Sequence, residues 1–86
     1  MDVHHLVEMA NQIGRFYAAE LDQSQAMLDT ATHLRRSWDP RLRRALLTHL
    51  TDKAGAGLDP FVLESIKAHR TLLEPKPSAP QAPAGS

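Results

Sequence analysis

The sequence has no cysteine, one tryptophan, one tyrosine and two phenylalanines. Without cysteine the chain can form no disulfide, and it has neither a thiolate metal ligand nor a cysteine nucleophile. No apolar run approaches the roughly 20 residues that a membrane-spanning helix needs. The first residues, Met-Asp-Val-His-His, lack the basic and apolar regions of a signal peptide. We therefore expect a soluble, cytoplasmic protein.

An excess of charge of either sign is also missing. Ten Lys and Arg balance ten Asp and Glu in 86 residues, so the formal net charge is zero. A neutral chain has no long-range field to hold a polyanion, and nucleic-acid binding would need a local basic patch. The chain has no glycine-rich phosphate loop and no serine in a glycine-flanked strained turn. These absences favour a chain that is not an enzyme.

The apolar residues that are present favour helix over sheet. Twelve Ala and twelve Leu stand against five Val plus Ile. We predict an all-α fold, a small antiparallel bundle of about four short helices in residues 1–73. Four of the six prolines fall in the last twelve residues. We therefore predict that residues 74–86 form a disordered Pro/Ala-rich tail.

Apolar periodicity and capping residues place the first two helices. The first is predicted over residues 3–20, and the second starts at Asp22 or Ser24 as N-cap and ends around Ser37. Three- and four-residue steps put seven residues of the first helix on one broad face. They are Val3, Leu6, Met9, Ala10, Ile13, Phe16 and Tyr17.

Two Asp-Pro pairs start the remaining helices. Asp39 and Asp59 each supply an N-cap acceptor, and the proline that follows suits the first helical turn. Two glycines in residues 54–57 predict the turn between these helices. His49 and His69 lie within the apolar stripes of the third and fourth helices. We interpret them as hydrogen-bonded core or interface histidines, because two imidazoles without a third ligand make a poor metal site.

Half of the positive charge lies in residues 35–44, as five arginines around the single tryptophan. Arginine and tryptophan anchor protein interfaces through planar hydrogen bonds and large rigid apolar area. If Leu42, Leu46 and Leu50 face the core, the third helix presents Leu47 on a flank outside it. We predict a partner-binding surface made of Arg35, Arg36, Trp38, Asp39, Arg41, Arg43, Arg44 and Leu47.

Three alternatives remain open for this segment. It could be a solvated helix corner with Trp38 in the core of the bundle. The second and third helices could form a helix-turn-helix that binds nucleic acid, with Arg41, Arg43 and Arg44 at the start of the recognition helix. The chain could also be a helical module that associates only with itself.

Five stretches of the sequence together match the pattern of a known family. They are Met9-Ala10-Asn11-Gln12-Ile13, Phe16-Tyr17-Ala18-Ala19, His33-Leu34-Arg35-Arg36, Trp38-Asp39-Pro40-Arg41-Leu42-Arg43 and Gly57-Leu58-Asp59-Pro60. Through these stretches the chain resembles, over about residues 5–62, the delta subunit of NAD-dependent, molybdenum-containing formate dehydrogenases. In place of the methionine and the second phenylalanine common in that family, this chain has Leu42 and Tyr17, which keep both positions apolar.

The resemblance implies a non-catalytic accessory subunit of a cytoplasmic enzyme. Its partner would be the catalytic alpha subunit, in a complex that also contains beta and gamma subunits. Those subunits would carry bis-molybdopterin guanine dinucleotide, iron–sulfur clusters and FMN, with no cofactor in this chain. The resemblance further implies that the delta chain supports the assembly or the cofactor integrity of the alpha subunit. It implies neither a nucleic-acid nor a membrane partner.

Overall fold

The computed structural model describes residues 2–75, and the described residues contain helices and no strand. The predicted all-α fold is therefore confirmed. The predicted tail, residues 74–86, lies outside the described residues from residue 76 onward. The helices are α1 (Val3–Tyr17), α2 (Gln23–Ser37), α3 (Pro40–Lys53), α4 (Pro60–Ala68) and the single turn α5 (Arg70–Leu73).

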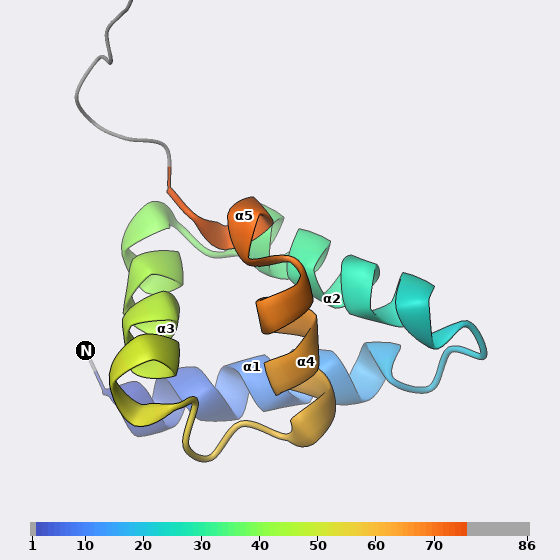
Figure 1. The fold of residues 1–86 in the computed structure, drawn as a ribbon, viewed down its shortest axis with the longest axis horizontal. Coiled ribbons are helices and arrows are strands. Elements are labelled where there is room, and N and C mark those ends of the chain that lie inside the picture. The colour runs from blue at the N-terminus through green and yellow to red at the C-terminus, as the bar shows by residue number, and fades with distance from the viewer. Residues whose placement is uncertain (1, 76–86) are drawn as a thin grey trace, which may run out of the picture.

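α1, α2 and α3 lie around the periphery of the fold, and α4 and α5 lie between them (Figure 1). After α1, residues 18–22 reverse the chain, so α2 returns in the opposite direction and packs on α1. α3 then runs across the molecule from the end of α2 to the start of α1. α4 packs against α1 and α2, and α5 packs against α2 and α3. Each helix contributes at least one fully buried side chain to a single core: Leu6, Leu34, Leu46, Ile66 and Leu73.

Aspartates start the helices as the sequence predicts. Asp22, rather than Ser24, caps α2 by accepting from the backbone N–H of Gln25. Asp39 caps α3 by accepting from two backbone N–H groups, at 2.9 and 3.1 Å. Asp59 precedes α4 as predicted, but its carboxylate accepts from Arg15 Nε on α1 at 3.2 Å and makes no side-chain cap. The predicted starts are therefore confirmed, although α4 begins without its capping bond.

One predicted helix end is wrong, and the fourth predicted helix is interrupted. The first helix ends at Tyr17 and not at residue 20, because the following carbonyls bond elsewhere: Gln23 Nε2 donates to those of Ala18 and Glu20 at 3.0 and 2.7 Å. The fourth predicted helix is divided in two at His69, whose φ of −123° and ψ of 35° leave the helical region. The break lets α5 turn toward α3, which it contacts.

The turn between α3 and α4 is the predicted glycine turn, and it is held from two sides. Gly55 and Gly57 have φ of 72° and 90°, in the left-handed region that glycine adopts without strain. The His49 Nε2 donates to the Ala56 carbonyl at 2.7 Å. Because His49 is also buried, its interpretation as a hydrogen-bonded core histidine is confirmed. His69 is half-buried at the α4–α5 junction.

Candidate protein-docking site

Two of the eight predicted partner-binding residues belong to the core. Trp38 is 6% exposed and belongs to the hydrophobic core cluster, to which every helix contributes. Leu47, also 6% exposed, was expected outside the core, and that expectation is wrong. The buried face of α3 is centred on Leu46, Leu47 and His49, because α3 packs against both α1 and α5. This rotates the helix relative to a wheel centred on Leu42 and Leu50, which are only half-buried.

Two of the arginines are used inside the chain. Arg35 Nη1 donates to the Leu72 carbonyl at 2.9 Å, and Arg43 Nη1 donates to the Leu73 carbonyl at 3.5 Å. Arg43 Nε also donates to the carbonyl of Trp38 at 3.2 Å. The last carbonyls of a helix have no partner within it, and a guanidinium with several donors satisfies them well. These two side chains therefore hold α5 against the ends of α2 and α3.

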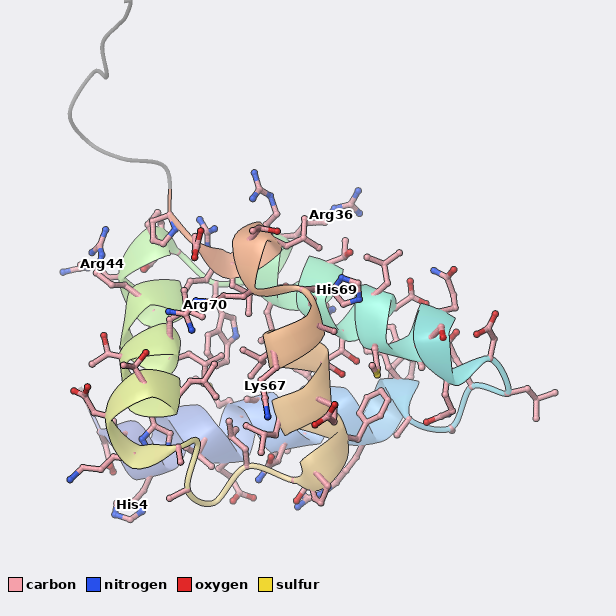
Figure 2. The ribbon with its side chains drawn as sticks, viewed as in Figure 1. His4, Arg36, Arg44, Lys67, His69 and Arg70 are labelled. Atoms are coloured by element: carbon pink, nitrogen blue, oxygen red, sulfur yellow. The ribbon has the colours of Figure 1, made fainter. Side chains whose placement is uncertain are left out.

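Three arginines remain for a partner. Arg36, Arg41 and Arg44 are exposed, and within residues 2–75 no side-chain hydrogen bond or ion pair involves them. The ion pairs among the described residues are Arg15–Asp59, which joins α1 to the start of α4, and Arg70–Glu74 at α5. Figure 2 shows Arg44 projecting outward from the first turns of α3, and Arg36 projecting from the end of α2 beside α5. Asp39, between them in sequence, is occupied as the N-cap.

A groove of about 840 Å³ runs beside two of these arginines. Its walls are the first two turns of α1, one face of α3 and the glycine turn. Arg41 and Arg44 lie at the end formed by the start of α3, and His4 lies toward the other end (Figure 2). Sequence reasoning missed this groove, because its walls come from segments about 40 residues apart. Its apolar lining is Val3, Val7, Ala45 and Ala56.

A second, smaller hollow of about 340 Å³ lies between α1 and α2. Tyr17 Oη and His33 Nδ1 share a hydrogen bond of 3.2 Å across it. Phe16, which the sequence places on the apolar face of the first helix, is 74% exposed and packs edge-on against Tyr17. The buried face of α1 is therefore narrower than the apolar face on which the sequence places Phe16. The buried face consists of Leu6, Val7, Ala10, Asn11 and Gly14.

Other kinds of site find little support in residues 2–75. No three His, Asp or Glu side chains of the described chain gather closely enough to hold a metal ion. None of the described helices is long and apolar enough to cross a membrane. α2 and α3 share no extended packing face, since α3 packs on α1 and α5. This differs from a helix-turn-helix, whose two helices pack on each other.

Comparison with family models identifies the chain. Comparison with the curated proteins and with the solved structures finds no match. A family model, described as NADH-dependent formate dehydrogenase delta subunit FdsD, matches residues 5–66. That range covers most of the chain, including most of α1, all of α2 and α3, and the greater part of α4. It also contains the exposed arginines and every wall of the groove except Val3 and His4. The chain belongs to the family of NADH-dependent formate dehydrogenase delta subunits.

Proposed function

We propose that this delta subunit is a non-catalytic accessory chain that docks on the molybdenum-containing alpha subunit of a cytoplasmic formate dehydrogenase. The complex also contains beta and gamma subunits, and the delta chain supports the assembly or cofactor integrity of the alpha subunit. The single observation that carries the docking role is the set of exposed guanidinium groups of Arg36, Arg41 and Arg44, none of which is paired within residues 2–75. Membership of the delta-subunit family indicates that the enzyme is a formate dehydrogenase.

The arginines support docking because of how charge is arranged around them. Exposed cations on a chain without net charge add little to its own stability. The same guanidinium groups bind carboxylates of a partner bidentately, and such pairs are strong when the partner excludes water. Arg35 and Arg43 keep α5 in place beside this surface. Trp38 lies in sequence between Arg36 and Arg41, and its buried indole packs in the core.

Co-purification with the catalytic subunit tests the docking surface. The triple variant Arg36→Glu, Arg41→Glu and Arg44→Glu should bind the alpha subunit at least about tenfold more weakly, which corresponds to about 1.4 kcal/mol. Its far-UV circular dichroism should match that of the wild type, because the three side chains are exposed and make no hydrogen bond or ion pair with the described part of the chain. Lys67→Glu, a charge reversal at an exposed position of α4, is the control and should bind the alpha subunit normally. If the triple variant binds as well as the wild type, these three arginines are not part of the docking surface.

A second measurement tests the accessory role. The alpha, beta and gamma subunits are produced with and without the delta chain, and molybdenum is measured per alpha subunit. The proposal expects a lower molybdenum content without the delta chain, and partial loss with the triple arginine variant. Equal molybdenum content in all three preparations would contradict the role in assembly or cofactor integrity. The readout is metal content, so it does not depend on the rate of formate oxidation.

A further inference from the structure

We propose that the groove between α1 and α3 holds an amphipathic helix of a partner subunit. The apolar face of that helix packs on Val7 and Ala45, and its carboxylates pair with Arg41 and Arg44. This inference rests on the proposed function, because it names the chemistry of the segment that the docking surface receives. It adds the occupant, its conformation and the end of the groove at which its acidic residues lie.

The groove has the length of a short helix. Its lining positions on α3 are 41, 44, 45, 48, 49, 52 and 53, which follow three- and four-residue steps along one face. Twelve residues of rise, from 41 to 53, give roughly 18 Å, or about three helical turns. Val3, His4 and Val7 on α1, together with the glycine turn, line the rest of the groove. A partner helix lying along α3 contacts both walls.

Backbone chemistry favours a helical occupant over an extended one. The walls are mostly helix, so most of their N–H and C=O groups already bond within α1 and α3. An extended segment would bury main-chain groups in the groove and find few partners for them. A helix satisfies its own main chain and presents only side chains, which is how apolar grooves receive helices in other complexes.

The charges orient the occupant. Arg41 and Arg44 stand three residues apart on one helix face, and like charges at this spacing repel each other. Within residues 2–75 no carboxylate pairs with either of them. At the other end of the groove Asp52 and Lys53 have opposite charges and balance each other. Complementarity therefore places the acidic residues of the partner helix beside the first turns of α3.

Thiol protection in the assembled complex tests whether the groove is occupied. The chain has no cysteine, so Thr48→Cys, at an exposed groove position of α3, creates its only thiol. Alkylation of that thiol by N-ethylmaleimide is followed by mass spectrometry in the free chain and in the formate dehydrogenase complex. We expect modification at least about tenfold slower in the complex, as for a site opened only rarely. Glu64→Cys, at an exposed position of α4, is the control and should react equally in both.

A thiol at position 48 that reacts equally fast in both states overturns the inference. If the complex forms normally in that case, the docking role stands and only the groove is wrong. If the wild-type chain does not co-purify with formate dehydrogenase at all, the proposed function itself fails. The two failures are therefore distinguishable.

Carbodiimide coupling tests the chemistry of the occupant. Arg44→Lys keeps the charge and supplies an amine, which forms an amide with an activated carboxylate lying against it. In the intact complex we expect coupling to Asp or Glu in a partner segment with apolar residues at helical spacing. Coupling to a second copy of this chain, or to a segment without that spacing, overturns the proposal. No coupling at position 44 in a complex whose Thr48→Cys thiol is protected overturns the acidic assignment.

Discussion

At the scale of single residues, Asn11 joins two distant parts of the fold. Its amide nitrogen donates to the Gly57 carbonyl at 3.0 Å, and its amide oxygen accepts from the Asp59 N–H at 2.8 Å. The side chain is 5% exposed. Asn11→Ala leaves two backbone groups without partners, and we expect the free energy of unfolding to fall by about 2–3 kcal/mol in urea titration. Gln12→Ala, on the exposed neighbour, should change it by less than about 0.5 kcal/mol.

Leu47 separates a core role from a docking role. Because its side chain is buried in the hydrophobic cluster, Leu47→Ala should lower the free energy of unfolding by about 2–5 kcal/mol. Thr48→Ala, one position along on the exposed side of α3, should leave it nearly unchanged. Thermal unfolding of the two variants checks the difference. A Leu47→Ala chain of wild-type stability that no longer binds the alpha subunit would return this residue to the docking surface.

The residue contacts that sequence predicts are the local ones. Asp39 caps α3 through N–H groups two and three residues away, and a capping residue followed by proline is readable in one short window. Arg35 and Arg43 instead bond to carbonyls 37 and 30 residues away. No periodicity encodes such pairs, because they depend on where α5 ends. The predicted surface therefore included two arginines that are already used inside the chain.

At the scale of helices, Gly14 allows α1 and α4 to approach closely. A Cβ placed at Gly14 would overlap the Val62 side chain, which is fully buried. Gly14→Ala gains about 1 kcal/mol of helix propensity, but the overlap should cost about 1–3 kcal/mol. We expect a lower midpoint of urea unfolding. Val62→Ala in the same chain removes the overlapping methyl groups, so the double variant should be more stable than the sum of the two single changes predicts.

The junction of α1 and α2 gathers acidic side chains. A hydrogen bond with Asp29, then burial, then repulsion from Asp29 and Asp22 raise the pKa of Glu20 above its ordinary value. A raised carboxyl pKa in the folded state contributes stability below the ordinary pKa, and this is lost as pH rises through the folded value. Glu20→Gln should therefore raise the unfolding midpoint at pH 7, with the difference vanishing in acid. A gain that is equal at all pH values would contradict this assignment.

The starts and ends of helices were predictable where a single local residue sets them. They were less predictable where packing between helices sets them. The starts of α2, α3 and α4 follow their aspartates, and the glycine turn follows its two glycines. The break at His69 has no glycine or proline to mark it. It lies where the chain, still packed on α2, also reaches α3, and only the assembled fold defines that point.

At the scale of the whole molecule, the groove and the charge arrangement are properties of the fold. Residues 1–34 carry five acids and one base, and residues 35–44 carry five arginines and one acid. The acidic α1–α2 junction and the arginines of residues 35–44 lie at opposite ends of α2 (Figure 1). The fifteen residues of α2 span roughly 22 Å. A chain without net charge is therefore strongly polarised. The charge segregation was visible in the sequence, and its distance in space was not.

This polarity predicts how salt affects association with the alpha subunit. Arg36, Arg41 and Arg44 should steer the encounter, so the association rate constant should fall as salt rises from about 0.01 to 1 M and the Debye length shrinks from about 30 to 3 Å. Stopped-flow measurements of the triple variant Arg36→Gln, Arg41→Gln and Arg44→Gln should show a flatter salt dependence. Lys67→Gln, which removes one charge at an exposed position of α4, is the control and should keep nearly the wild-type slope. Flattening by Lys67→Gln of about one third of that in the triple variant, in proportion to the charge removed, would mean that total charge, and not the placement of Arg36, Arg41 and Arg44, controls the encounter.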